Sequence, residues 1–147
     1  SVLPSIVVDT NLLVADDDAF SSYSMEVCLN SAGLKAHYCS NGEEACLLVE
    51  KKLESSANTD PGYKVIFMDC HMPKMDGMAA TKRIRELLRK KEGLSEQVVI
   101  IGTTAQNDEA LNKEMIEAGM NEVVIKPIVK ETVSQLFVKY NYFKQDS

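Results

Sequence analysis

The chain has 147 residues and a formal net charge of −6, with 45% hydrophobic and 26% charged residues. This length suits a single domain with a substantial core. The acidic balance argues against nucleic-acid binding by this domain. No apolar run approaches the roughly 20 residues of a membrane helix, so we expect no membrane contact by this domain. The four cysteines form no C-x-x-C pair, which favours reduced thiols in a cytoplasmic protein, although a parent protein could be membrane-anchored.

Short apolar runs alternate with segments of helical periodicity along the chain. The runs predict five strands, at residues 12–15, 35–39, 65–68, 98–101 and 123–125. A helix is predicted after each strand; the first spans 22–32, and the next three begin near Asn41, at Gly77 and at Asn107 or Asp108. The last carries an apolar stripe of Val133, Leu136, Phe137 and Tyr140. This alternation favours a parallel sheet with helices on both faces.

Two further segments need an interpretation. Residues 1–10 are an N-terminal extension, in which residues 6–8 form either an edge strand or an ordered arm. The helix after Gly77 has an apolar face and a basic one. We interpret the basic face as solvated, because acids are interleaved with it, and an acidic docking partner is the alternative. Its members are Lys82, Arg83, Arg85, Arg89, Lys90 and Lys91.

Polar side chains follow four of the predicted strands. They are Asp16 and Asp17 after the first strand, Asp69 after the third, Thr103 and Thr104 after the fourth, and Lys126 after the fifth. In a parallel sheet these groups emerge at one edge, where open α/β sheets bind ligands. Polar strand ends and helix caps explain any one of them. The set together indicates a site with three carboxylates, a hydroxyl and an ammonium.

The chemistry of such a site follows from its groups. Three nearby carboxylates repel one another and raise one another's pKa, which a divalent cation would relieve. Oxygen ligands suit Mg²⁺, while an ammonium and a hydroxyl suit the oxygens of a phosphoryl group. A carboxylate can accept that group and form an acyl phosphate. The only two histidines, His37 and His71, are too few for a zinc site.

Four segments that carry these residues resemble the receiver domain of two-component response regulators. They are LLVADDD at 12–18, IFMDCHMPKMDG at 66–77, IIGTTA at 100–105 and VIKP at 124–127. The sequence around Asp69 is similar to that of receivers attached to hybrid sensor histidine kinases. The resemblance implies a flavodoxin-like (βα)5 fold, a doubly wound parallel sheet in the order 2-1-3-4-5, with residues 11–147 as the receiver domain.

The resemblance also implies roles in a His-Asp phosphorelay. Asp69 would accept a phosphoryl group from a phosphohistidine of a histidine kinase or a histidine phosphotransfer protein. Mg²⁺ would be bound by Asp17, Asp69 and the backbone carbonyl of His71, with Asp16 acting on the metal through water. Thr104 and Lys126 would contact the phosphoryl group, and the Lys126–Pro127 bond would be cis. We expect no turnover of an independent substrate, only self-catalysed phosphotransfer and autodephosphorylation, alone or within a larger histidine kinase.

Three positions bear on how such a receiver would signal. The family often has an aromatic residue three positions before the lysine, and this chain has Val123 there. His71 and Gln106 stand two residues beyond Asp69 and Thr104, where the family tunes hydrolysis of the acyl phosphate. His71 either shields the site or positions a water molecule. The expected output surface is residues 107–142, which is also a possible homodimer contact.

Two other functions stay open. A haloacid-dehalogenase-type phosphatase would use Asp16 as nucleophile and Asp18 as acid/base, but Phe20 stands where that family has Thr or Val. A pseudo-receiver would keep the fold as a docking module without phosphorylation. A docking module, however, has no need to hold three carboxylates together at a cost in stability.

Overall fold

The structure is a computed structural model that describes residues 9–142. It contains five strands and five α-helices in strict alternation: β1 Leu12–Ala15, α1 Ala19–Ser31, β2 His37–Cys39, α2 Gly42–Glu54, β3 Val65–Asp69, α3 Gly77–Arg89, β4 Val99–Thr104, α4 Glu109–Ala118, β5 Glu122–Ile125 and α5 Lys130–Lys139. A 3-10 turn, Ser95–Gln97, precedes β4. The strand or arm predicted for residues 6–8 lies outside the described residues.

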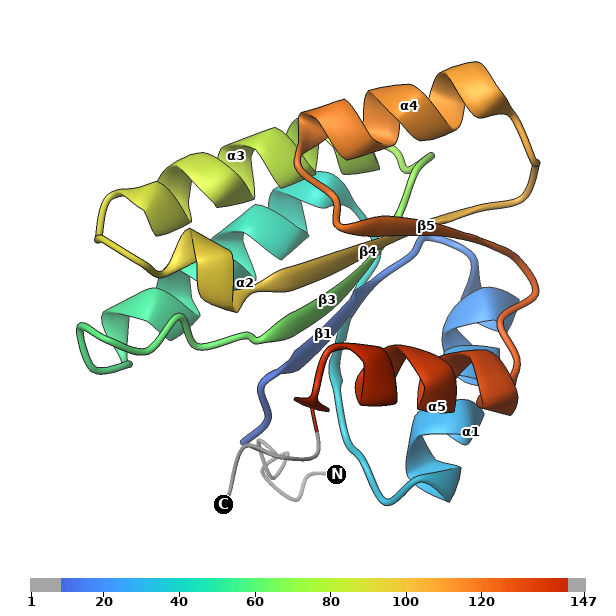
Figure 1. The fold of residues 1–147 in the computed structure, drawn as a ribbon, viewed down its shortest axis with the longest axis horizontal. Coiled ribbons are helices and arrows are strands. Elements are labelled where there is room, and N and C mark those ends of the chain that lie inside the picture. Colours follow the sequence, from blue (N-terminus) through green and yellow to red (C-terminus); the bar gives the residue numbers. More distant parts are fainter. Residues whose placement is uncertain (1–8, 143–147) are drawn as a thin grey trace, which may run out of the picture.

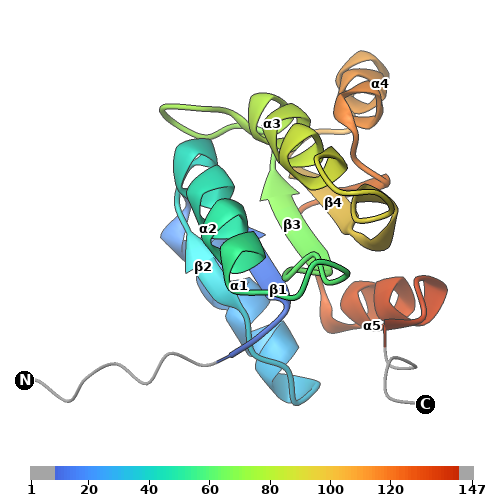
Figure 2. The ribbon, with the colours of Figure 1, turned by 90° about the vertical axis from the view of Figure 1, so that its left-hand side faces the viewer.

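The strands form one parallel sheet in the order β2-β1-β3-β4-β5, as the flavodoxin-like fold requires. The pairing of β1 with β3 sets Leu12 beside Val65. The pairing of β3 with β4 sets Asp69 beside Thr103. Helices α2, α3 and α4 cover one face, and α1 and α5 cover the other (Figure 1). Figure 2 shows α2 and α3 side by side on their shared face.

The core has two layers because side chains alternate across each strand. Leu13 and Ile66 join a cluster with Ala80 and Ile84 beneath α2 and α3. Their neighbours Leu12 and Phe67 face α1 and α5, where Phe67 meets Phe137 edge-on at 6.3 Å between ring centroids. Both clusters include residues with almost no exposed surface. The central strands are thus fixed from both sides, which fixes the edge where they end.

The predicted boundaries that differ most from the structure are the start of α1 and the end of β4, each by three residues; the other strand ends differ by at most two residues. Helix α1 begins at Ala19 rather than Ser22, because the Asp18 carboxylate caps it by accepting from the Phe20 amide at 3.1 Å. Strand β4 runs to Thr104 rather than Ile101, because its backbone stays paired with β3 and β5. The predicted cap Asn41 and stop Gly119 are confirmed.

The basic face of α3 was interpreted as solvated, and this is wrong for Arg85. Its side chain is only 6% exposed. The guanidinium donates to the carbonyl oxygens of Ser95, Val98 and Gly119 at 2.7–2.9 Å. Arg85 is therefore buried between α3, the segment before β4 and the end of α4, whereas Arg83, two residues earlier, is exposed.

The loop after β3 approaches neighbouring backbone closely at two glycines. The Gly77 amide donates to the Cys70 carbonyl, and a Cβ at Gly77 would lie 2.0 Å from the Asp69 carbonyl oxygen. A Cβ at Gly42 would lie 2.4 Å from the Met75 carbonyl oxygen. No side chain fits at either position, so these contacts hold the loop in a single path beside Asp69.

Replacing Gly77 with alanine should destabilise the fold by about 3 kcal/mol, because the new methyl group displaces the Asp69 backbone. Thermal unfolding without Mg²⁺ measures this. Gly33→Ala is the control, since a Cβ there meets open space and suffers only from the φ of +77°, at a cost of about 1 kcal/mol. Equal losses in the two variants would show that the close approach at Gly77 is unimportant.

The two ends of the described chain meet at the amino end of β1. The Tyr142 hydroxyl hydrogen-bonds the Asn11 side chain, and the Tyr142 ring stacks on Phe137 at 4.7 Å between centroids.

Within residues 9–142, no helix has the length and apolar character needed to cross a bilayer. The four cysteines are free thiols, and burial raises the pKa of Cys46 and Cys70 to about 11.

Candidate functional site

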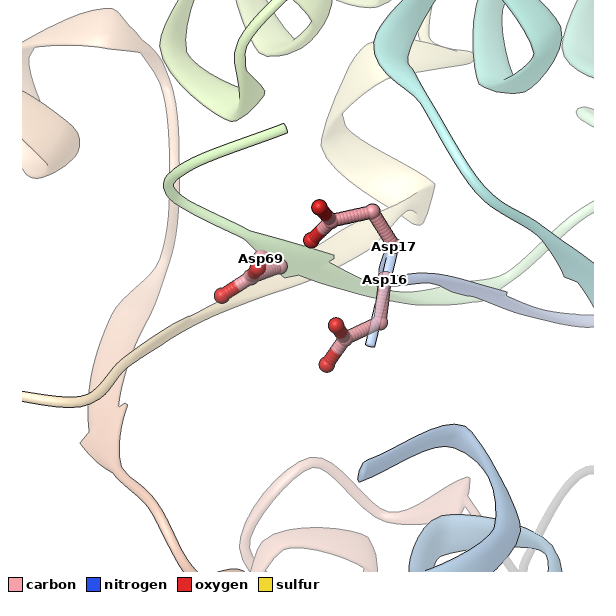
Figure 3. Close-up of side chains that lie close together, drawn as sticks. All are labelled: Asp16, Asp17 and Asp69. Atoms are coloured by element: carbon pink, nitrogen blue, oxygen red, sulfur yellow. The ribbon is translucent and has the colours of Figure 1, made fainter. Parts of the chain in front are cut away.

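The three predicted carboxylates converge at the carboxyl end of the sheet. Asp16 and Asp17 directly follow β1, and Asp69 is the last residue of the neighbouring strand β3. One oxygen from each lies within 4.8 Å of the others. Figure 3 shows the three side chains on the same side of the strand ends. Asp16 and Asp69 are each 7% exposed, whereas Asp17 is exposed, so the cluster is open to solvent through Asp17.

Lys126 completes the cluster from the far side of β4. It follows β5, and its ammonium lies 2.7 Å from an Asp16 oxygen and 3.2 Å from an Asp69 oxygen. Burial lowers the pKa of Lys126, but its hydrogen bonds to Asp16 and its attraction to Asp69 outweigh burial and leave the pKa raised. The next peptide bond, Lys126–Pro127, is cis as expected. One ammonium thus bridges two buried carboxylates.

Asp69 is the carboxylate in this group whose ionised form the fold disfavours. Burial raises the pKa of its carboxyl above the usual value, and the charge of Asp16 adds to the rise. Lys126 lowers the pKa without cancelling these effects, and Asp17 raises it further. The folded chain therefore disfavours the ionised form of Asp69 relative to the unfolded chain.

An Asp69→Asn variant should be more stable than the wild type at pH 7 in the absence of Mg²⁺. We expect a rise in Tm of roughly 2–4 °C, the shift that about 1 kcal/mol produces in a chain of this size. Because the folded-state pKa is raised, the advantage should shrink as the pH falls through it and vanish below the usual 3.8, where Asp69 is protonated in both states. Asp60→Asn, in an exposed turn, is the control. A difference in Tm between Asp69→Asn and the wild type that does not change with pH would contradict a raised pKa of Asp69.

The Thr104 hydroxyl, which was predicted to belong to the site, forms hydrogen bonds to the loop that follows β4. Thr104 ends β4 one position beyond Thr103, which pairs with Asp69 in the sheet. The Thr104 hydroxyl hydrogen-bonds the backbone of Gln106, with its amide and carbonyl both at 3.4 Å. These are long hydrogen bonds, so little holds the hydroxyl in this position.

Of the other three predicted positions, two are exposed and one is partly buried. His71 is exposed in the loop after β3, and Gln106 is exposed in the loop after β4. Val123 is partly buried and packs against the core cluster that contains Met115 and Met120. A valine there offers no ring that could move between buried and exposed positions.

The structure adds one feature that sequence reasoning missed. A cavity of about 50 Å³ lies beside Lys126, between α1 and the loop after β5. Its walls include Phe20, Met25, Phe67 and Pro127. Phe20 is 75% exposed and lies in the first turn of α1, which begins at Ala19 with Asp18 as its cap.

The donor set fits a hard divalent cation. Three carboxylate oxygens lie within reach of one ion, one of the carboxylates is exposed, and the single bridging ammonium leaves net negative charge. Mg²⁺ prefers such oxygen ligands and usually keeps several of its waters, for which the exposed side leaves room. The arrangement can therefore bind Mg²⁺ and present one carboxylate beside a cation.

Comparison with known families decides the class of the protein. The model of the response regulator receiver domain matches residues 12–137. The chain belongs to this family. The receiver domain thus functions in two-component phosphorelay signalling, and the four segments that suggested it all lie within the matched range or at its edges.

Relatives of this receiver domain occur in two architectures. Two-component response regulator 24 of Arabidopsis thaliana is 32% identical over 90% of this chain and 85% of that protein. The osmosensing histidine protein kinase SLN1 of Saccharomyces cerevisiae is 31% identical over 88% of this chain but only 10% of that protein. The chain therefore spans most of one relative and a tenth of the other.

A solved receiver domain shares the fold. The receiver domain of the histidine kinase CKI1 of Arabidopsis thaliana, complexed with Mg²⁺ and BeF₃⁻, is 28% identical, with a TM-score of 0.73 over 89% of both chains. The similarity in fold and sequence supports the flavodoxin-like assignment made above.

Proposed function

We propose that this receiver domain accepts a phosphoryl group on Asp69 from a phosphohistidine. The observation that carries the proposal is the convergence of three carboxylates and one ammonium at a single sheet edge, with Asp69 at the end of the central strand. The donor would be a histidine kinase or a histidine phosphotransfer protein. The match to a segment of a long histidine kinase supports this class of partner.

The transfer breaks one bond and forms another. An Asp69 carboxylate oxygen forms a bond to phosphorus while the bond from phosphorus to the imidazole nitrogen breaks. The imidazole keeps the electron pair of that bond and takes up a proton. Asp69 becomes an acyl phosphate, and its neighbour Lys126, 3.2 Å away, neutralises part of the added charge.

The other predicted residues have supporting parts. Asp17, Asp69 and the His71 backbone carbonyl would bind Mg²⁺ directly, with Asp16 acting through water. Bound Mg²⁺ would offset the repulsion between carboxylates and the charge on the phosphoryl oxygens. The Thr104 hydroxyl, which forms two long hydrogen bonds of 3.4 Å to Gln106, would turn to the phosphoryl group.

The two alternative functions fit less well. A dehalogenase-type phosphatase needs Asp18 as acid/base, but Asp18 accepts hydrogen bonds from the Phe20 amide and the Ser21 hydroxyl as the cap of α1. A docking module without phosphorylation gains nothing from the raised pKa of Asp69, which burial causes at a cost in stability. Dimerisation through residues 107–142 stays a proposal, supported by exposed Ile116, Ile125 and Val138.

The proposal is tested with the purified chain, Mg²⁺ and a small phosphodonor such as acetyl phosphate. The intact mass should increase by one phosphoryl group, and hydroxylamine, which cleaves acyl phosphates, should remove it. Addition of EDTA before the donor should prevent the gain, because the carboxylates then repel the anionic donor. A wild-type chain that gains no mass with Mg²⁺ present would refute the proposal.

A further inference from the structure

The guanidinium of Arg85 is a buried cation bound by neutral groups. Nη1 donates to the carbonyls of Ser95 and Val98 at 2.7 and 2.9 Å, and Nε donates to the Gly119 carbonyl at 2.9 Å. Nη2 donates to the Asn121 side-chain oxygen at 2.8 Å. Among residues 9–142 it forms no ion pair with a carboxylate. Five donors in a rigid fork suit this binding of several carbonyls at once.

These hydrogen bonds tie the carboxyl end of α4 to the sheet. Gly119 is the residue that ends α4, with a φ of +121°, and a Cβ there would lie 2.9 Å from Arg85 Cγ. Asn121 exchanges two hydrogen bonds with Ile100 of β4, each 2.8 Å long. The Asn121 oxygen thus accepts from both Arg85 and β4. The turn between α4 and β5 is bound on two sides.

The amino end of α4 has its Asp108 cap, which accepts from the Leu111 amide at 3.1 Å, but it has fewer buried side chains than the carboxyl end. The buried residues of the helix, Met115 and Ala118, both lie in its second half. The buried side-chain oxygen of Asn112, in its first half, has no hydrogen-bond partner among the described residues. A buried acceptor without a partner costs free energy that a small movement of the helix could recover. Thr104, weakly bonded to Gln106, precedes this end.

We propose that Arg85 is a positioning residue that clamps the carboxyl end of α4, so that phosphorylation displaces only its amino-terminal half. The fixed point is Gly119. The proposal rests on the proposed phosphorylation of Asp69. In this chain, which has Val123 in place of an aromatic residue, the movement begins at Thr104, passes through residues 105–108 and ends before the clamp.

The clamp is tested by hydrogen exchange measured on peptides from the two ends of α4, residues 107–113 and 117–122. In the unphosphorylated protein, Arg85→Met should speed exchange at 117–122 about tenfold more than at 107–113, because several charge-assisted hydrogen bonds are lost there. Arg85→Lys keeps the charge but not the fork and should restore only part of the protection. Arg83→Met, at an exposed arginine on the same helix, should change neither end.

A second comparison needs no variant. Phosphorylation of the wild-type chain, verified by mass in the same sample, should change exchange at 107–113 and leave 117–122 within about twofold. Equal changes at the two ends would overturn the clamp, as would equal acceleration of both ends in Arg85→Met. If the wild type gains no phosphoryl mass, the proposed function fails, and the comparison of the Arg85 and Arg83 variants still decides the clamp.

Discussion

An Asp69→Asn variant should gain no phosphoryl group from acetyl phosphate under conditions in which the wild-type chain is phosphorylated. The substituted amide would keep the shape of the side chain but lack the anionic oxygen that bonds to phosphorus. Asp69 ends the central strand, and Lys126 pairs with it and with Asp16. Intact-mass measurement with Mg²⁺ present records the result. The expected change is complete loss, because no other described carboxylate shares this position.

The control for this variant is Asp60→Asn, which removes one carboxylate from an exposed turn and should leave phosphorylation unchanged. Asp60 accepts a hydrogen bond from the Gly62 amide, and asparagine can accept the same bond. Full phosphorylation of the Asp69→Asn chain would move the phosphoacceptor to another residue. Asp16 would then be the first to examine, since it shares the same lysine.

Replacing Lys126 with methionine should slow phosphoryl transfer to Asp69 about a hundredfold, the usual effect of removing one fixed cation or donor from a developing anion. Methionine fills a similar volume but cannot pair with Asp16 or Asp69. The pKa of Asp69 should rise further, because Lys126 is the group that lowers it. We expect a loss of about 2 kcal/mol in stability, below the range for fully buried pairs because Lys126 retains some solvent contact.

Lys139→Met provides the matched control. Lys139 also pairs with a carboxylate, Glu122, at 2.8 Å, but its side chain is 60% exposed. Loss of that pair should change stability little, because an exposed ion pair is screened by solvent, and it should leave the transfer rate unchanged. Transfer rates measured by mass against time compare the variants. A Lys126→Met chain that is phosphorylated at the wild-type rate would exclude Lys126 from the transfer.

The position of the carboxylates was predictable because parallel strands constrain it. A parallel sheet places the carboxyl end of the strand before Asp69 at the same edge as Asp16 and Asp17. The strand order implied by the family resemblance sets β3 beside β1, and the structure has this pairing. The end of β4 was harder to predict. Gly102 and two threonines interrupt the apolar signal, yet backbone pairing with β3 continues to Thr103, and pairing of this kind leaves no pattern in the side chains.

The role of Arg85 could not be predicted from local sequence. A helical wheel places it one turn from Thr81 and Leu88, both buried, but buried arginines usually have a carboxylate partner. Here the partners are mainly backbone carbonyls, and every residue has one. Which carbonyls lie within reach depends on the path of the chain 10 to 34 residues further on.

The contact between Tyr142 and Asn11 has a consequence for evolution. It joins the entry to β1 and the exit from α5 at the end of β1 opposite to Asp16. A unit whose two connections leave together, away from its reactive edge, can be spliced into or out of a longer polypeptide without disturbing the chemistry. The same fold can therefore serve as most of a small regulator and as a tenth of a large kinase, as the relatives of this chain illustrate.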